Sequence, residues 1–396
     1  MRILMINSVC GIRSTGRICT DIATALTKKG HEVKIAYGRE HVPTQYRDYA
    51  VKIGSGMDVN RHVLQARIFD NAGFGSKAAT RKFITWVKEY DPDIIHLHNL
   101  HGYYIHVGEL FSYLKTCGKK ILWTLHDCWA FTGHGAYFDT LECEKNGRCH
   151  HSSQKNDYPK SLIDFSSRNF ERKKNLFTGV PNLTLITPSE WLANLVRNSF
   201  LKEYSVTVIH NGIDTTIFKP RVLEAKKLRK KFRLEGKQVL LGVASIWDQR
   251  KGLDDLLELS AQLKSYQQLV LIGLSKEQLT KLPKEIIGLT TTDSAEELSA
   301  WYTLADVFIN PTTQDNYPTT NLEAIACGTP VVSYPTGGSI ESTHMYGIVC
   351  SDRTVTSILE SLKEVSQCKR NPNFNLSKEY FVENILNLYY SPAVNV

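Results

Sequence analysis

Two successive series of short apolar segments alternate with amphipathic ones along this chain, and this alternation constrains the fold more than any other feature. Apolar runs separated by helical patterns are typical of strands buried on both faces of a parallel sheet. In the first series the expected strands are Arg2–Asn7, 31–38, Asp93–His98, 120–127, Leu183–Thr187 and Val206–His210. In the second they are Val239–Ala244, Leu269–Gly273, Asp306–Asn310 and Pro330–Tyr334. The pattern predicts an α/β fold of two Rossmann-like, doubly wound domains.

A turn-rich stretch separates the two series. It runs from Asn211 to Pro220 and begins with an Asn-Gly turn signal. The 396 residues also favour two domains, at roughly 100–200 residues each. We expect one domain over residues 1–212, a second over 213–375, and a terminal helix over 376–396 that packs back on the first. Residues 133–160 lack a hydrophobic period, which predicts a long insertion loop.

Helix starts are also readable from the sequence. A helix is expected at about Ile18–Lys29, after a loop that contains Gly11 and Gly16. Ser294 and Glu297 have the spacing of a capping box, in which each side chain binds the other residue's backbone N–H. A short helix around 321–327 should end at Gly328.

The loops that follow the second-series strands hold the clearest candidates for chemistry, because ligands of open α/β sheets bind beyond the carboxyl ends of the strands. Arg250 and Lys251 follow the first of these strands and suit a diphosphate. Asp315 and Glu323 follow the third, and Glu323 lies in the first turn of the next helix, where it could accept hydrogen bonds from ribose hydroxyls. The same position equally suits a carboxylate that only favours the helix dipole.

The start of that same helix is a candidate phosphate site. Thr319, Thr320 and Asn321 are expected to supply its N-cap and, with Leu322, backbone N–H groups for phosphate oxygens.

The first domain carries most of the histidines. His98 and His101 crowd the end of one expected strand, and His126 and Asp127 end the next. His126 is the better catalytic candidate because an acid follows it at a strand terminus. The loop from Ser8 to Ile18 lacks the dinucleotide-binding glycine spacing, which disfavours a nicotinamide dehydrogenase; it is either a backbone cradle or a plain turn.

Metal binding is a weaker interpretation of this domain. Cys128, His134, Cys143, Cys149, His150 and His151 supply possible ligands, but they lack the paired-cysteine spacing of a structural zinc site. We therefore expect no metal and no cofactor.

Together these motifs resemble the retaining glycosyltransferases of family 4, which have the GT-B fold with a nucleotide sugar in a central cleft. Asp315-x₇-Glu323 with EAIACGTPVV is similar to the family's E-x₇-E and the run after it, and WTLHDCWAFTGH, HLHNLHGYY, RKG and HNGID resemble further family elements. The similar group is that of bacterial colanic-acid, capsule and O-antigen enzymes. Asp315 stands where Glu is commoner.

The resemblance implies roles for the candidates. Glu323 would bind the donor ribose, and Asp315 would lie near the reacting centre of the transferred sugar. Arg250 and Lys251 would neutralise the diphosphate without a metal. On the other side of the cleft, Gly16 would belong to a loop that closes over the substrates, and His126 would contact the sugar.

Acceptor-side candidates are Arg13, His98, His101 and Asp127. The expected activity is transfer of a hexose, from a UDP-sugar more than a GDP-sugar, to a growing lipid-diphosphate-linked oligosaccharide. A hydrolysing UDP-sugar 2-epimerase of the same architecture and a non-catalytic glycan-binding relative are the alternatives.

Charge and cysteine content bear on location. Of the net charge of +8, residues 1–200 hold 27 Lys+Arg and 18 Asp+Glu, so the whole surplus lies in this half, including Arg61, Arg67, Lys77, Arg81 and Lys82. Such a surplus suits an anionic membrane surface, and no nucleic-acid partner is expected. The nine cysteines are odd in number and widely spaced, no apolar run approaches the roughly 18 residues of a membrane helix, and no signal peptide is evident. We expect a cytoplasmic protein, peripheral on the inner membrane.

Overall fold

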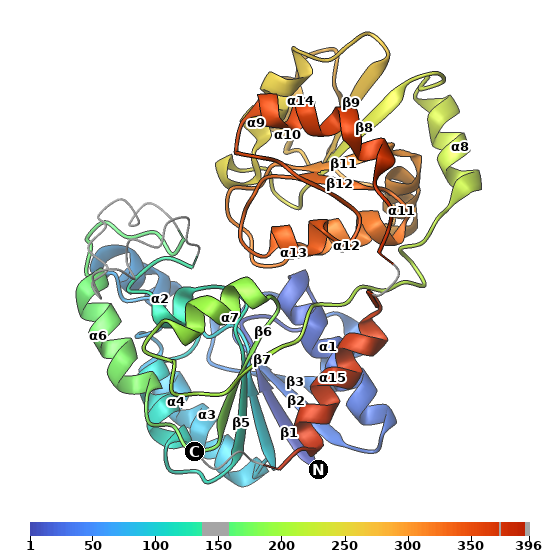
Figure 1. The fold of residues 1–396 in the computed structure, drawn as a ribbon. Coiled ribbons are helices and arrows are strands. Elements are labelled where there is room, and N and C mark those ends of the chain that lie inside the picture. Colours follow the sequence, from blue (N-terminus) through green and yellow to red (C-terminus); the bar gives the residue numbers. More distant parts are fainter. Residues whose placement is uncertain (137–157, 372–373, 393–396) are drawn as a thin grey trace. The chain divides into compact units, whose positions relative to one another are not determined.

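The computed structural model describes residues 1–136, 158–371 and 374–392, and it divides into two compact units, each with its own parallel sheet (Figure 1). Unit 1 comprises Met1–Ile209 with Val382–Val396, and unit 2 comprises His210–Phe381. Most of the expected 133–160 insertion, from 137 to 157, lies outside the described residues. Two doubly wound α/β domains, the architecture that the alternation predicts, are confirmed.

Unit 1 contains a seven-stranded sheet in the order β3-β2-β1-β4-β5-β6-β7. Its strands are β1 (Arg2–Ile6), β2 (Glu32–Tyr37), β3 (Ala50–Lys52), β4 (Ile94–Leu97), β5 (Lys120–Thr124), β6 (Leu183–Thr187) and β7 (Val206–Val208). Its helices are α1 (Arg13–Lys28), α2 (Gly56–Phe69), α3 (Lys77–Tyr90), α4 (Val107–Leu114), α6 (Ser166–Phe177) and α7 (Glu190–Arg197). The winding reverses between β1 and β4, because the chain runs outward from β1 to β3 and then returns to the other side of β1.

Unit 2 contains a six-stranded sheet in the order β10-β9-β8-β11-β12-β13. Its strands are β8 (Gln238–Val243), β9 (Gln267–Ile272), β10 (Ile287–Leu289), β11 (Val307–Asn310), β12 (Val331–Ser333) and β13 (Gly347–Val349). Its helices are α8 (Val222–Lys231), α9 (Leu253–Ser260), α10 (Lys276–Thr280), α11 (Ala295–Leu304), α12 (Thr319–Ala326), α13 (Ser339–Thr343) and α14 (Val355–Glu364). Here the winding reverses between β8 and β11.

The last helix, α15 (Lys378–Tyr390), begins among the residues of unit 2 and ends among those of unit 1. In unit 1 it binds the sheet through Tyr389, whose hydroxyl lies 2.6 Å from Nδ1 of His96 on β4. In unit 2, Lys378 pairs with Asp214, which lies in the turn-rich stretch that separates the two series.

Three local expectations are wrong. Helix α1 begins at Arg13, so Gly16 lies in its first turn and not in a loop. Helix α12 has Pro318 as its N-cap, with no side-chain cap from the threonines or Asn321. Ser294 does cap α11, but the carboxylate of Glu297 accepts from the N–H of Asp293, one residue before the expected donor.

Candidate functional site

The loops after β8 and β11 meet at the point where the winding of unit 2 reverses, which is where doubly wound sheets bind ligands. Gly252 makes the close approach possible: its φ is +72°, and a Cβ there would lie 2.4 Å from the carbonyl oxygen of Pro311. The backbone carbonyl of Arg250 accepts a hydrogen bond from the N–H of Thr313 at 2.9 Å. The two loops are therefore joined through their backbones.

The predicted cations and the first predicted carboxylate lie together in these loops. Lys251 Nζ lies 2.5 Å from Oδ2 of Asp315, and Nη1 of Arg250 lies 3.9 Å from the same oxygen. Arg250 also donates to the carbonyl oxygen of Gln314 at 2.7 Å. All three charged side chains are about one-fifth exposed, so the ion pair remains in reach of a ligand from solvent.

Glu323 is held by a residue that the sequence did not single out. It lies in the second turn of α12, not in the first turn as expected, and its Oε2 accepts a hydrogen bond of 3.0 Å from the hydroxyl of Tyr302 on α11. Burial raises the pKa of Tyr302 well above its usual value, so the hydroxyl keeps its proton and donates. No local signal marks Tyr302, because its role depends on how α11 packs against α12.

Asn321 and Leu322 are buried inside unit 2. Asn321 is fully buried; its Oδ1 accepts from Asn310 at 2.8 Å, and its Nδ2 donates to Ser342 at 2.9 Å. Leu322 belongs to the core of unit 2. The side chains of both residues are thus structural, and only their backbone could serve a phosphate, whereas Thr320 is partly exposed.

A second missed group lies beside the turn motif between the two series. The ring of His210 stacks on Tyr317 with centroids 4.8 Å apart, and its Nε2 lies 3.3 Å from Glu341. The Asn211-Gly212 turn signal marks this segment of the sequence, but it does not predict that the ring of His210 stacks on Tyr317.

In unit 1 the histidines do gather at the carboxyl ends of β4 and β5. Nδ1 of His98 lies 3.1 Å from Nε2 of His126, and Nε2 of His101 lies 2.6 Å from Oδ2 of Asp127. Burial lowers the pKa of His126 to about 4, and burial also lowers the pKa of His98 well below its usual value. The imidazole of His126 is therefore neutral near pH 7.

The loop after β1 lies beside these groups at the reversal point of unit 1. Asn7, fully buried, accepts a hydrogen bond from the N–H of Asn99 in the loop after β4. Gly16, in the first turn of α1, lies close to the loop after β1, because the N–H of Gly11 in that loop donates to the carbonyl oxygen of Gly16 at 3.2 Å. Arg13 forms an ion pair of 2.8 Å with Glu40.

The described residues contain no group of three or more His, Cys, Asp or Glu side chains arranged for a metal ion. His134, one of the possible ligands, pairs instead with Asp70 at 2.6 Å. Cys143, Cys149, His150 and His151 lie outside the described residues.

Comparison with known proteins places these features in a family. The model of glycosyltransferase family 4 matches residues 15–217, which is half of the chain. The chain belongs to glycosyltransferase family 4. A second model, for group 1 glycosyl transferases, matches residues 237–367 and covers most of unit 2.

Individual relatives of this family 4 protein are also glycosyltransferases by name. A putative colanic acid biosynthesis glycosyl transferase of Escherichia coli is 28% identical over 229 residues, covering 54% of this chain and 55% of the relative. A Campylobacter jejuni enzyme, N,N'-diacetylbacillosaminyl-diphospho-undecaprenol alpha-1,3-N-acetylgalactosaminyltransferase, is 27% identical over 158 residues, 38% of this chain and 42% of that one. The chain thus spans about half the length of the curated relatives it matches.

The fold likeness extends over the whole chain. The Anabaena protein HepE, solved in complex with UDP-glucose, has a TM-score of 0.64 at 14% identity and covers 99% of this chain and 100% of its own. The GT-B fold that the motifs implied is confirmed.

Proposed function

We propose that this protein is a retaining, metal-independent hexosyltransferase of bacterial surface polysaccharide assembly, of the O-antigen, capsule or exopolysaccharide kind. It would move a sugar from a nucleotide diphosphate, UDP rather than GDP, to a lipid-diphosphate-linked oligosaccharide. Family membership supports the reaction class. The names of the colanic-acid and diphospho-undecaprenol relatives support the acceptor class, and UDP-glucose in the Anabaena protein supports the donor class.

The observation that carries the proposal is the cluster of Arg250, Lys251 and Asp315 at the reversal point of unit 2. Breaking a glycosyl–phosphate bond builds negative charge on the phosphate and positive charge on the sugar. A diphosphate would displace Asp315 as the partner of Lys251, and the freed carboxylate could then bind sugar hydroxyls. The two cations supply the charge that a metal would otherwise provide.

Glu323 would complete the donor site. Its Oε2 is bound by Tyr302, so the carboxylate is oriented before a ligand arrives, and ribose hydroxyls could donate to it. The start of α12 would face the phosphates with its backbone N–H groups.

Unit 1 would bind the acceptor and the transferred sugar. His126 is neutral and suited to hydrogen bonds with sugar hydroxyls, while His101 is oriented by Asp127. In a same-face displacement the departing phosphate takes the proton of the acceptor hydroxyl, so retention requires no protein nucleophile.

The test is a panel of UDP- and GDP-sugars, each incubated with and without a lipid-diphosphate oligosaccharide, in EDTA. Acceptor-dependent UDP release with retained anomeric configuration is expected. Acceptor-independent release with inversion at the sugar C2 would instead indicate the epimerase, and binding without turnover of any sugar would indicate a glycan-binding relative.

Variants test the donor assignment. Lys251→Gln and Glu323→Gln should each lower kcat/KM at least about 100-fold, as lost electrostatic groups do at a transition state. Lys284→Gln, which removes an exposed lysine elsewhere in unit 2, is the matched control. Near-normal kcat/KM in Lys251→Gln would refute the assignment.

A further inference from the structure

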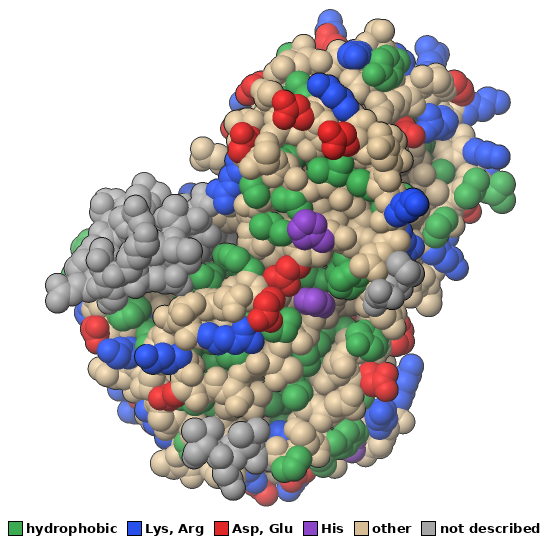
Figure 2. All heavy atoms as spheres, in the orientation of Figure 1, with side chains coloured by type: hydrophobic (Ala, Val, Ile, Leu, Met, Phe, Trp, Pro, Cys, Tyr) green, Lys and Arg blue, Asp and Glu red, His purple; other side chains and the backbone are tan. Residues whose placement is uncertain are grey.

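One lysine of unit 1 lies in the interior. Lys173, on α6, is 1% exposed, whereas its neighbour Lys174 is exposed, and Figure 2 shows Lys and Arg side chains on the surface of both units. Lysine is almost never fully buried without partners, because its head group loses hydration on burial. Nothing in the sequence distinguishes the two lysines, which stand together in a basic run. The buried position of Lys173 is explained only by what its N–H groups contact.

The partners of Lys173 lie in the residues that follow β5, 127–136, which we call the β5 segment. Nζ of Lys173 donates to the carbonyl oxygen of Trp129 at 2.7 Å and to that of Thr132 at 3.1 Å. The same nitrogen lies 3.8 Å from the centre of the Trp129 ring, within the range of a cation–π contact. Such contacts are stronger away from water, and Trp129 is buried. Lys173 therefore holds both the backbone and the ring of Trp129.

Trp129 in turn contacts both members of the His101–Asp127 pair. The N–H of Trp129 donates to Oδ1 of Asp127 at 3.0 Å, and its ring packs against the imidazole of His101 with centroids 5.5 Å apart. The other carboxylate oxygen of Asp127 lies 2.6 Å from Nε2 of His101. Because an ionised carboxylate only accepts hydrogen bonds, Nε2 of His101 is the donor. Trp129 thus links Lys173 to this pair.

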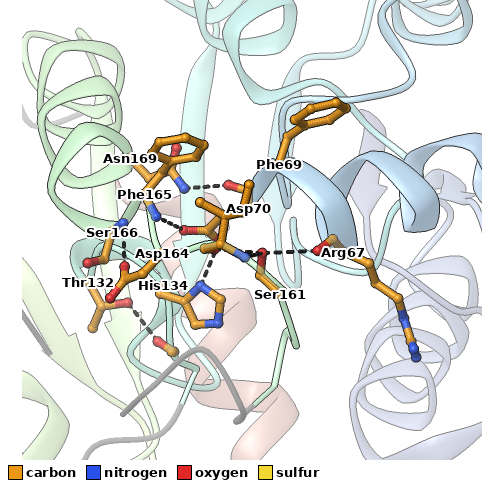
Figure 3. Close-up of polar contacts among 12 residues, drawn as sticks. Arg67, Phe69, Asp70, Thr132, His134, Ser161, Asp164, Phe165, Ser166 and Asn169 are labelled. Atoms are coloured by element: carbon orange, nitrogen blue, oxygen red, sulfur yellow. Dashed lines mark hydrogen bonds and ion pairs between the residues drawn. The ribbon is translucent and has the colours of Figure 1, made fainter. Parts of the chain in front are cut away.

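The far end of the β5 segment is held independently of Lys173. In Figure 3, the ring of His134 points toward Asp70, the residue that ends α2, and Nδ1 of His134 lies 2.6 Å from Oδ1 of Asp70. The start of α6 reaches the same residue, because the N–H of Phe165 donates to its carboxylate and the amide of Asn169 donates to its carbonyl oxygen. Loss of the Lys173 contacts should therefore release only the end of the segment that is nearer to β5.

We propose that Lys173 is a positioning residue of the acceptor site, which fixes the His101–Asp127 pair by holding Trp129. This inference rests on the proposed function, in which unit 1 binds the acceptor. A group displaced by about 1 Å can cost about 100-fold in rate, so a rigid support matters even where it does not touch a substrate. Methionine would fill a similar volume, but it would leave the carbonyl oxygens of Trp129 and Thr132 without this donor.

Steady-state kinetics separate the acceptor from the donor. Lys173→Met should raise the acceptor KM at least about tenfold and leave the donor KM within about twofold, because the donor candidates belong to unit 2. Lys174→Met removes the exposed neighbour on α6 and should change neither KM. Phe83→Leu, in the core of unit 1, should lower the melting temperature without changing either KM.

The assays use the full chain and a lipid-diphosphate oligosaccharide in detergent micelles. Among the described residues, no helix combines the length and apolar content that a bilayer crossing requires.

A second readout needs no turnover. In the full chain labelled with ¹⁵N-histidine, Nε2–H of His101 should give a proton signal far downfield, because a hydrogen bond to a carboxylate is strong. His101→Gln identifies this signal among those of the 13 histidines. Lys173→Met should shift or broaden the signal, whereas Lys174→Met and Phe83→Leu should leave it in place.

Trp129→Phe provides both measurements if Lys173→Met does not fold. It keeps the backbone contacts with Lys173 and Asp127 and changes only the ring. A smaller ring under Nζ and beside His101 should raise the acceptor KM about threefold and shift the His101 signal.

Three results would overturn the proposal. They are an unchanged acceptor KM or an unchanged His101 signal in folded Lys173→Met, or in Trp129→Phe in its place, a donor KM that rises as much as the acceptor KM, and equal changes in Phe83→Leu. The last result would mean that Lys173 only stabilises unit 1. A wild type without acceptor-dependent turnover would refute the proposed function instead, and the His101 signal alone would then decide whether Lys173 positions the pair.

Discussion

Replacing Gly252 with alanine should destabilise the contact between the loops after β8 and β11 by an amount that follows from the structure. A left-handed φ such as its +72° costs a non-glycine residue roughly 1–2 kcal/mol, partly offset by the lower entropy of the unfolded chain. In addition, the new Cβ would lie 2.4 Å from the carbonyl oxygen and 2.8 Å from Cγ of Pro311. Backbone must move to relieve this contact, and overpacking of that kind costs about 1–3 kcal/mol more.

Gly236→Ala is the matched control. Its φ is +69°, and no atom lies within 4 Å of the position that a Cβ would take, so only the conformational cost applies. At about 2–4 °C per kcal/mol for a unit of this size, a net cost of about 1 kcal/mol lowers the melting temperature by about 2–4 °C in Gly236→Ala, and a total of about 2–4 kcal/mol lowers it by about 4–16 °C in Gly252→Ala. Calorimetry measures both, and titration with UDP-glucose should show weaker binding in Gly252→Ala alone. Equal shifts in both variants would refute the close approach of the two loops.

Three further outcomes are expected. Tyr302→Phe should raise the donor KM about tenfold and reduce discrimination against 2′-deoxyribose donors, because the carboxylate of Glu323 loses the hydrogen bond that orients it. The control is Tyr204→Phe, which removes a buried tyrosine hydroxyl from unit 1 and should leave both properties unchanged. Asp315→Glu should keep the pair with Lys251 and retain most turnover, whereas Asp315→Ala should not. Burial lowers the pKa of His62 and His126 to about 4 and the pKa of His96 to about 3. As pH falls below about 6.5, these histidines therefore bind protons in the unfolded chain before they do so in the folded protein, which favours unfolding. The melting temperature should drop progressively toward pH 4, and a melting temperature that does not change with pH would contradict this.

Much of the fold follows from the sequence, because strands buried on both faces leave an apolar signature that little else produces. The same signal places His126, Asp127, Arg250 and Asp315 at strand ends, and the structure does bring the members of each unit together. The loops that carry these residues are neighbours because β4 lies beside β5 in one sheet and β8 lies beside β11 in the other.

Side-chain direction could not be predicted in the same way. Asn321 lies in a polar sequence that suits a phosphate site, yet its amide forms hydrogen bonds with four buried side chains, one at the end of β11 and three on α13. Tyr302 lies in an apolar helix that suggests only core packing, yet its hydroxyl reaches Glu323. Both outcomes depend on contacts between helices that are distant in sequence, which a periodic pattern does not encode.

The two reversal points differ in their chemistry, and this difference supports a division of labour between the units. In unit 1 the groups at the strand ends are His126, kept neutral by burial, and His101 beside its acid, which suit hydrogen bonds to sugar hydroxyls. In unit 2 these groups are two cations, Arg250 and Lys251, in the loop after β8. Gly252 allows this loop to pack closely against the loop after β11. Under the proposed function a diphosphate would replace Asp315 as the partner of Lys251, so the Lys251–Asp315 pair would hold this positive charge in place until the donor binds. If so, raising ionic strength should weaken donor binding in the wild type and weaken it less in Lys251→Gln, because the variant keeps only Arg250 to attract the diphosphate.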